Sequence, residues 1–288
     1  MFKQISIIAA LALLASCSVK EDRMKCVAPV TVRVSGFSVS QEDFPDTRTA
    51  VADYNGVKVL TLAFYDGATA VYKTTQVKDD PSTFTTFGEF STRLPIGSYT
   101  MVALGYVLYE DDELTLTSPT QAEYTDGYIR ETFSATQPVN ITSTQALNLS
   151  ATLDRTVSCL KVISTDGKTA NVSKVRMTFS AGGKRFSPST GLATVNTGSQ
   201  SVVGVSALVG NPSTSIGYVF LASDEQTMDV TIETLDADGN TILSQTVTDV
   251  PFKRNRRTKL TGALYSANAS AGSFQLNTEW VADYNDTF

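Results

Sequence analysis

Short runs of alternating apolar and polar residues recur along this chain from about residue 30 towards its end. Examples are "VTVRVSGF" (Val30–Phe37), "VKVLTLAFYDG" (Val57–Gly67) and "SKVRMTFS" (Ser173–Ser180). A period of two places successive side chains on opposite faces of a strand, so each run predicts a strand with one buried face. Beyond the first sixteen residues, no window of about eleven residues has the 3.6-residue period of an amphipathic helix. The sequence therefore predicts an all-β fold.

The spacing of the runs predicts how the strands are connected. Asp66-Gly67 separates two runs and is typical of a tight hairpin turn, whereas Pro95 and Gly97 divide the apolar segment 90–107 into two strands. Turn residues recur about every 8–12 residues, which is the spacing of β-sandwiches. The pattern restarts at Ala146, close to the point where an acidic first half gives way to a charge-balanced second half. We therefore expect two tandem Greek-key-type β-sandwich domains, at residues 28–150 and 151–288.

Composition excludes several kinds of chemistry. The 288 residues contain no histidine, which removes Ser-His-Asp triads, Cys-His pairs and His-ligated metal sites. Three cysteines are too few and too scattered for a zinc site, and a net charge of −6 disfavours binding to nucleic acid. No pair of carboxylates is singled out for glycoside hydrolysis. We expect neither an enzyme nor a cofactor or metal site.

The N-terminus carries the pattern of a cleaved signal peptide, residues 1–16. Lys3 supplies a positive charge, and the apolar stretch from Ile5 to Ala15 is too short for the roughly 20 helical residues that span a bilayer. Leu14-Ala15-Ser16-Cys17 resembles the bacterial lipobox, which predicts cleavage between Ser16 and Cys17 and a diacylglycerol on the Cys17 thiol. The alternative is an ordinary secretory signal with a cysteine at the cut by chance.

The residues after Cys17 read as a lipidated tether, 17–27. Lys20-Glu21-Asp22 looks like the signal, a lysine with two acids, that exports lipoproteins to the cell surface in Bacteroidetes. A solvated, charged tether with no such role is the alternative. Either way, an acylated Cys17 predicts a protein held by lipid in the outer membrane, with its domains exposed on the cell surface.

Five segments follow one another in a set order. They are the lipobox with its acidic tether and "VTVRV", "TRTAVADYNGVKVLTLAFYDG" (Thr47–Gly67), "RLPIGSYTMVAL" (Arg93–Leu104), "LDRTVSCLKVIST" (Leu153–Thr165) and "VPFKRNRRTKLTGALYS" (Val250–Ser266). In this order they resemble the Bacteroidetes fimbrillin superfamily, which includes major fimbrillins and anchor-type minor subunits. The resemblance covers most of the mature chain. It implies two β-sandwich domains and assembly, with other fimbrial subunits, into surface fimbriae.

The resemblance also implies a route of assembly. Stalk subunits of that superfamily lose their first strand and lipid to an Arg-specific protease, and a neighbour's strand fills the opened groove; anchor subunits keep both. In this chain Arg48 lies in "FPDTRTA", so cleavage between Arg48 and Thr49 would release residues 17–48. An uncut loop arginine is the alternative. The C-terminal segment "SFQLNTEWVADYNDTF" is accordingly either a donor strand or the last native strand.

Other clusters have a structural and a functional interpretation. "KRNRRTK" (Lys253–Lys259) is either a solvated turn or a polyanion or glycan patch, "DADGN" (Asp236–Asn240) a hairpin turn or a calcium loop, and "YEDDEL" (Tyr109–Leu114) a solvent-facing loop or a cation site. Cys159 is either a small buried side chain or the partner of Cys26 in a disulfide.

Taken together, the sequence predicts a surface lipoprotein that acts as a fimbrial subunit, anchor or associated adhesin, with a possible host or bacterial surface ligand. A glycan-binding surface lipoprotein of a nutrient-uptake system is the alternative, with Trp280 and surface tyrosines as its stacking platform.

The lipobox gives a direct prediction. Removing the side chain that is expected to be acylated, Cys17→Ala, should abolish lipid labelling and release the protein from the membrane fraction, because the remaining chain has no acyl anchor. Radiolabelled fatty-acid incorporation and fractionation measure both effects. Labelling that persists in Cys17→Ala would contradict the assignment.

Overall fold

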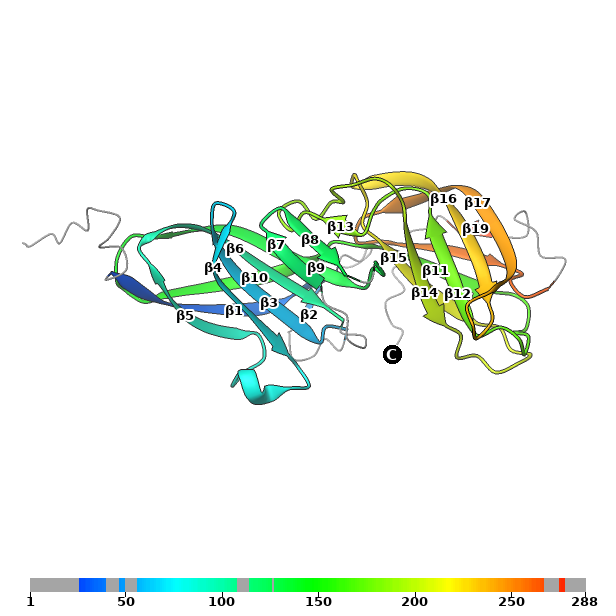
Figure 1. The fold of residues 1–288 in the computed structure, drawn as a ribbon, viewed down its shortest axis with the longest axis horizontal. Helices are drawn as coiled ribbons and strands as arrows, with labels where there is room; N and C mark the ends of the chain where they lie inside the picture. Colours follow the sequence, from blue (N-terminus) through cyan, green and yellow to red (C-terminus); the bar gives the residue numbers. More distant parts are fainter. Residues whose placement is uncertain are drawn as a thin grey trace, which may run out of the picture.

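The computed structural model describes residues 26–39, 47–49, 56–107, 114–125, 127–266 and 275–277. Within these ranges the chain is built from strands, with one 3₁₀ turn, η1 (Pro81–Thr83), and no α-helix. The strands form two bodies that lie end to end along the long axis of the molecule (Figure 1). The all-β fold expected from the alternation of residues is confirmed.

The first body is a single, strongly curved sheet with the strand order β2-β1-β10-β9-β6-β3-β4, and β5 pairs with β1 on the same edge as β2. Its strands are β1 (Val27–Val39), β2 (Thr47–Thr49), β3 (Val59–Asp66), β4 (Thr69–Val77), β5 (Glu89–Pro95), β6 (Gly97–Tyr106), β9 (Thr132–Ile141) and β10 (Leu147–Arg155). The sheet curls around one apolar core, to which β1, β5 and β10 contribute from one side and β3, β6 and β9 from the other.

Two local expectations in this body are confirmed. β3 and β4 form an antiparallel hairpin, and Gly67 in the turn has a φ of 61°, a left-handed conformation that glycine adopts without steric penalty. β5 ends at Pro95 and β6 begins at Gly97, as the two breaks in the apolar segment predict.

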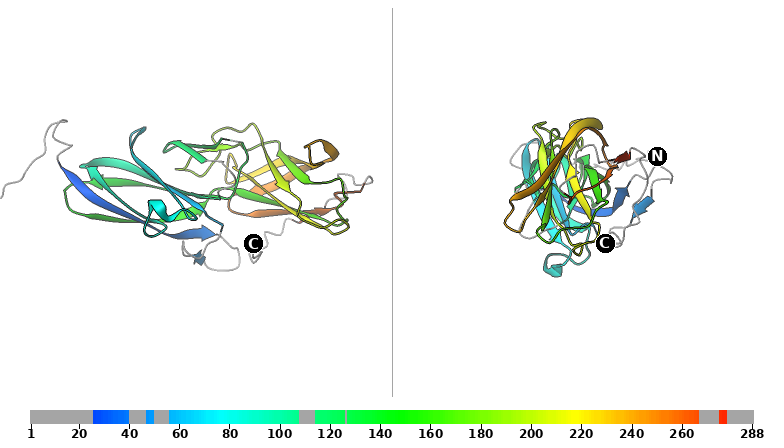
Figure 2. Two further views of the ribbon diagram at one scale, coloured as in Figure 1. Left: turned by 60° about the horizontal axis from the view of Figure 1, so that its bottom comes forward. Right: turned by 90° about the vertical axis from the view of Figure 1, so that its right-hand side faces the viewer.

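The second body is a sandwich of two four-stranded sheets, with the orders β15-β11-β18-β19 and β14-β12-β16-β17. Its strands are β11 (Ser158–Ser164), β12 (Lys174–Phe179), β14 (Ser199–Gly204), β15 (Thr214–Val219), β16 (Glu225–Leu235), β17 (Thr241–Lys253), β18 (Arg257–Gly262) and β19 (Gln275–Asn277). A separate apolar cluster fills the space between the sheets. The two layers are visible in the views of Figure 2.

A small third sheet joins the bodies. β7 (Leu114–Ser118) and β8 (Gln121–Tyr124) form a hairpin from the first half of the chain, and β13 (Arg185–Phe186) from the second half pairs with β8. A third apolar cluster lies beneath it and combines side chains of β3, β6, β7 and β8 with Phe186 and Phe220. The two bodies therefore share both a sheet and a core.

The joint between the bodies lies later in the chain than residue 150. Leu147–Arg155 forms β10, which pairs with β1 and β9 of the first body, and β11 of the second body begins at Ser158. The boundary expected at residues 150 and 151 thus falls inside β10. The pattern restarts at Ala146 because a new strand begins there, but that strand still belongs to the first core.

The shared core depends on a file of aromatic rings. Phe186 stacks on Phe220 with 4.2 Å between ring centroids, Phe220 lies 6.5 Å from Tyr124, and Tyr124 meets Tyr106 edge-on at 6.3 Å. Phe220 and Phe186 are fully buried. Rings from both halves of the chain therefore hold the bodies together.

Truncating the central ring of this file tests its role. Phe220→Ala is expected to lower the free energy of unfolding by about 3–5 kcal/mol, the usual loss for a buried phenylalanine, as measured by urea denaturation. Val71→Ala on the edge strand β4, where the side chain is 44% exposed, serves as the control and should change stability by less than about 0.5 kcal/mol. Equal midpoints for the two variants would show that the joint is loosely packed.

Candidate functional site

β1 occupies the position on which the candidate site is built. Along Val27–Arg33 it pairs antiparallel with β5, and along Val30–Ser38 it pairs parallel with β10. It runs from the outer end of the first body towards the joint (Figures 1 and 2). The most N-terminal strand of the structure therefore lies between two strands that are far later in the chain, with neighbours on both of its edges.

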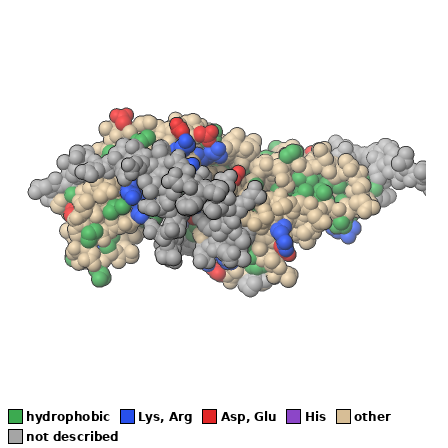
Figure 3. Space-filling view, turned by 180° about the vertical axis from the view of Figure 1, so that it is seen from behind, with side chains coloured by type: hydrophobic (Ala, Val, Ile, Leu, Met, Phe, Trp, Pro, Cys, Tyr) green, Lys and Arg blue, Asp and Glu red, His purple; other side chains and the backbone are tan. Residues whose placement is uncertain are grey.

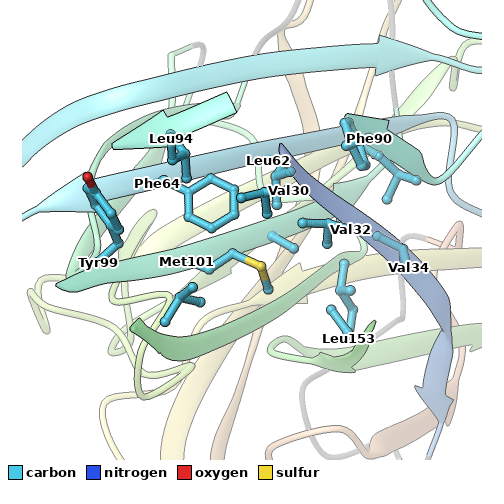
Figure 4. Packing of buried hydrophobic residues seen from close by; sticks show 14 of the residues in the cluster. Val30, Val32, Val34, Leu62, Phe64, Phe90, Leu94, Tyr99, Met101 and Leu153 are labelled. Carbon is cyan, nitrogen blue, oxygen red and sulfur yellow. The ribbon is translucent and has the colours of Figure 1, made fainter. Parts of the chain in front are cut away.

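The alternation in "VTVRVSGF" sets which side chains β1 buries. Ala28, Val30, Val32 and Val34 are 0–4% exposed, whereas the residues between them are exposed. Figure 4 shows Val30, Val32 and Val34 pointing from β1 into the core towards side chains of the facing strands. On the outer face, the Arg33 guanidinium donates to the Glu89 carboxylate of β5 at 2.8 Å, a surface pair that contributes little to stability.

The regular alternation ends at a β-bulge. The register with β10 shifts between Val34 and Gly36, so Ser35 is an extra residue, and its hydroxyl donates to the carbonyl oxygen of Ala151 at 3.2 Å. After the bulge the next large buried side chain is Phe37, which is fully buried and has its ring 4.9 Å from that of Phe133. β1 therefore buries its side chains at intervals of two, and then once at an interval of three.

A buried glutamine on β4 also holds β5 in position. The Gln76 side chain of β4 donates to the carbonyl oxygen of Glu89 at 2.7 Å and accepts from the backbone N–H of Gly88 at 2.8 Å. Because Gln76 is only 3% exposed, these bonds form out of water and hold β5 beside β4 independently of β1. β5 thus has a support that does not depend on β1.

The expected processing site lies next to β1. Thr47–Thr49 forms the short edge strand β2, in which the residues pair antiparallel with β1: Ser38 faces Arg48 and Phe37 faces Thr49. The bond between Arg48 and Thr49 is therefore held extended at the edge of the sheet. The turn that the sequence predicts at Pro45 and Asp46 lies outside the described residues.

Other predicted site residues also fall outside the described ranges. They are the cleavage and lipidation residues Ser16 and Cys17, the export signal Lys20, Glu21 and Asp22, and Trp280. All of the acidic run 109–114 except Leu114 lies outside as well. Their predicted roles stay predictions.

Cys159 does not form the disulfide that was one of its two interpretations. Its thiol is free and buried, so the bridge to Cys26 is not made and the interpretation as a small buried side chain is confirmed. Burial raises the pKa of the Cys159 thiol to about 11, and the neighbouring Arg257 guanidinium offsets this only in part. A thiol that stays protonated at neutral pH is a poor nucleophile.

The basic run 253–259 spans the turn between β17 and β18, with Lys253 at the end of β17 and residues 257–259 in β18. The Lys253 ammonium lies 2.9 Å from the Glu225 carboxylate, and the Arg254 guanidinium lies 2.7 Å from the Asp224 carboxylate. These ion pairs within the chain balance two of the positive charges of the run. Asn255 has a φ of 59°, a conformation that asparagine tolerates in turns. Only residues 254–256 form the expected turn, and Arg257, in β18, is buried instead of solvated.

"DADGN" is the hairpin turn that the sequence predicts. It connects β16 and β17, and the Asp236 carboxylate accepts from the backbone and side-chain N–H groups of Asn240 at 2.8 and 2.9 Å. These bonds occupy the carboxylate that a calcium loop would offer to the ion, and they hold the pKa of Asp236 below its ordinary value.

The C-terminal segment is described only at β19. Gln275–Asn277 pairs antiparallel with Lys259–Thr261 of β18 in the same chain, as expected of a last native strand. Before it, the Asp166 carboxylate accepts from the backbone N–H groups of Leu264, Tyr265 and Ser266 at 2.7–2.8 Å. Burial alone would raise the pKa of Asp166, but the three N–H groups outweigh it and lower the pKa.

The joint contains a buried ion pair that sequence reasoning missed. Arg155, the last residue of β10, lies 2.6 Å from the Glu131 carboxylate, and both side chains are less than 10% exposed. The guanidinium also lies over the Phe133 ring, 5.2 Å from its centroid, and donates to the Asn255 side chain of the second body at 3.3 Å. The only sequence signal was the arginine within the motif "LDRTVSCLKVIST", and its partner Glu131 lies in an unremarkable segment.

The described surface offers few features typical of a ligand site. In these ranges, no group of three or more His, Cys, Asp or Glu residues is placed to hold a metal ion, and no helix is long and apolar enough to cross a membrane. Seen from behind, the visible part of the molecule has charged side chains of both signs interspersed with scattered apolar ones (Figure 3). The β1 position and the joint are therefore the distinctive features of the described structure.

Comparison with known proteins gives a family without an assigned role. The model of DUF6562, described as a family of unknown function, matches residues 29–287. No curated protein matches the chain at a significant level.

Among solved structures, the chain is similar to the fimbrial anchor protein Mfa2 from Porphyromonas gingivalis, with 13% identity, a TM-score of 0.48 and coverage of 82% of this chain and 91% of that one. It is also similar to a protein described as "a putative adhesin" from Bacteroides ovatus, with 13% identity, a TM-score of 0.49 and coverage of 82% and 87%. A third is the C-terminally truncated tip fimbrial protein Mfa3 from Porphyromonas gingivalis, with 10% identity, a TM-score of 0.39 and coverage of 87% and 98%. Identities this low transfer no function from those proteins to this chain.

The buried ion pair can be tested by removing one partner or both. Arg155→Met is expected to lower the free energy of unfolding by about 3–5 kcal/mol, because it takes the cation away from a buried carboxylate. The double variant Arg155→Met/Glu131→Leu should lose less than either single change, and a double-mutant cycle in urea measures the difference.

The control is the exposed pair Lys58–Asp79, where Lys58→Met should cost less than about 1 kcal/mol. A double variant that is as unstable as the sum of its parts would mean that Arg155 and Glu131 contribute independently.

Proposed function

This chain belongs to DUF6562, a family of unknown function, and we propose that it is a surface lipoprotein that acts as a fimbrial subunit, anchor or fimbria-associated adhesin, assembles by β-strand exchange and catalyses no reaction. In this proposal an acylated Cys17 holds the protein in the outer membrane, and Lys20-Glu21-Asp22 direct it to the cell surface. Its partners are other fimbrial subunits, and a host or bacterial surface ligand is expected for an adhesin.

The position of β1 is the observation that carries the proposal. β1 comes first among the described strands, directly follows the tether, and fills a place between β5 and β10. One cut after Arg48 would separate β1 and everything before it from the rest of the chain. The groove left behind would expose two rows of unpaired backbone groups and an apolar floor, the features that an added strand restores.

The free energy contributed by burying the side chains of β1 explains why such a groove would need a new strand. Val30, Val32, Val34 and Phe37 are almost completely buried, and full burial of one such side chain contributes about 1.5–3 kcal/mol. Their sum, on the order of 10 kcal/mol, is comparable with the whole unfolding free energy of a domain, about 5–15 kcal/mol. A first domain without β1 is therefore expected to be unstable until another strand takes its place.

Whether β1 stays on decides the role within a fimbria. A chain that keeps residues 17–48 remains bound to the membrane with its groove filled, which suits an anchor. A chain cut after Arg48 loses its lipid and opens its groove, which suits a polymerising subunit. The acyl chain and β1 are thus removed together or retained together.

The alternative, glycan binding, receives no support from the described side chains. Sugar rings usually stack on exposed aromatic rings, and every aromatic side chain whose surroundings are described is buried or half-buried. The exposed large apolar side chains in the same ranges are Val71, Leu208 and Val209.

Proteolysis by an Arg-specific protease tests the proposed processing. Wild-type protein is expected to yield a product that begins at Thr49, and Arg48→Ala should prevent this product, because the protease recognises the arginine before the cut bond. N-terminal sequencing identifies the product, and SDS-resistant ladders on gels report assembly after trimming.

Arg93→Ala serves as the matched control, since Arg93 is an exposed arginine in another strand of the same sheet, and it should leave the Thr49 product unchanged. If neither intact nor trimmed protein associates with itself or with a fimbrial subunit, the fimbrial role is wrong.

A further inference from the structure

The position of β1 between β5 and β10 is selective for the side chains of the strand that occupies it. Resting on the proposed strand exchange, we infer that this place accepts a strand from a different protein, with Ala at the first of four alternate positions, Val at the next three, and an aromatic residue three positions after the last of them. Residues 28, 30, 32, 34 and 37 of β1 define this pattern in the present structure.

The aromatic position is the most demanding of the five. The Phe37 ring lies against Gly105 near the end of β6, where a Cβ atom would come within 3.0 Å of the ring and within 3.3 Å of Leu60 and Leu153. A glycine inside a strand weakens it and often marks a close approach. Gly105 thus leaves the space that the Phe37 ring occupies, with Phe133 beside it.

The bulge fixes the spacing before the aromatic residue. Ser35 is the extra residue, and its hydroxyl lies 3.2 Å from both the carbonyl oxygen of Ala151 and the hydroxyl of Thr152 on β10. A strand that alternated without a bulge would turn its aromatic side chain out of the sheet, because a shift of one residue exchanges the two faces. The interval of three is therefore part of the recognition.

The valine positions have a size limit as well. The buried side chains of β1 face Leu62, Phe64 and Met101, all fully buried, so larger residues at 30, 32 or 34 would overpack the core (Figure 4). Smaller ones would leave cavities, which also weaken binding. The strand is thus selected on side-chain volume at each buried position.

Apart from β1 itself, which an uncut copy keeps in its own first body, no segment of a second copy of the chain fits this pattern. In the printed sequence, four Ala, Val or Ile residues at alternate positions followed three later by an aromatic occur only at 28–37. Two segments match in part. Val203, Val205, Ala207 and Val209 have Pro212 at the aromatic position, and the segment from Tyr265 to Phe274 has alanine in place of all three valines. Tyr265 of that segment is buried in the second body, and β19 directly after it pairs with β18.

A peptide exchange experiment tests the inference. The full mature chain receives a specific protease site between Ser40 and Thr47, is nicked there, and is mixed with fluorescent peptides at a urea concentration below its unfolding transition. The peptides are Val27–Val39, the same peptide with Phe37→Ala, and Leu264–Leu276 from the chain's own C-terminal part. Uptake is measured by fluorescence anisotropy.

Nicked wild-type protein is expected to bind Val27–Val39 at least about a hundredfold more tightly than the Phe37→Ala peptide or Leu264–Leu276, since losing a buried aromatic or several buried methyl groups has effects of that order. In Gly105→Val protein the new side chain fills the ring's space, so the preference for the native peptide over the Phe37→Ala peptide should fall below about tenfold. Gly204→Val is the matched control, because nothing lies within 4 Å of a Cβ there, and it should keep the wild-type preference.

Each outcome separates the inference from the proposed function. Equal uptake of the native peptide and the Phe37→Ala peptide by wild-type protein would overturn the aromatic requirement while leaving strand exchange intact. Uptake of Leu264–Leu276 as tight as that of Val27–Val39 would overturn the assignment to a different protein. Uptake of no peptide would overturn strand exchange itself, and the inference with it. The wild-type arm decides these points even if Gly105→Val does not fold.

Discussion

The first body depends on a strand that is inserted between two others, because β1 supplies one face of the core and pairs along both edges. Without it, β5 and β10 have no common neighbour, although Gln76 still holds β5 to β4. The side chains of β1 complete the core around which the curved sheet closes. The rest of the first body therefore contacts β1 along both of its edges and over its buried face.

The inserted strand ends beside the joint between the two bodies. Phe37 contacts Phe133, and Phe133 lies beneath the guanidinium of Arg155, which pairs with Glu131 and bonds to Asn255 of the second body. These contacts form a continuous path from β1 to the second sandwich. The shared sheet of β7, β8 and β13 and the aromatic file around Phe220 add further contacts, so the bodies are joined over a broad area.

Several features followed from local sequence alone, each for a simple physical reason. Asp66-Gly67 predicted a hairpin because glycine adopts a left-handed φ without penalty, and the structure has one there. "DADGN" predicted a turn between two strands, and it is one. The alternation of Val30, Val32 and Val34 identified the buried face of β1, because the side-chain period of a strand is two.

Other features needed the folded chain. The second domain was expected to begin at residue 151, close to where the pattern restarts, yet β10 (Leu147–Arg155) pairs with β1 and belongs to the first core. Cys159 could not be distinguished as bridged or buried until its neighbours were known. The pairing of Arg155 with Glu131 and the approach of Gly105 to Phe37 left no mark in the local pattern.

The sequence by itself thus determined the all-β class, several of the turns and the buried face of β1, because these depend on residues close together along the chain. It did not determine the burial of β3: the run Val57–Gly67 predicted one buried face, and β3 is buried on both. Only the tertiary structure decided which strands are neighbours. Ser35 and Ala151 are 116 residues apart in the sequence and yet share a hydrogen bond. Strands so far apart in the sequence become neighbours because the volumes and shapes of their buried side chains pack together in one core.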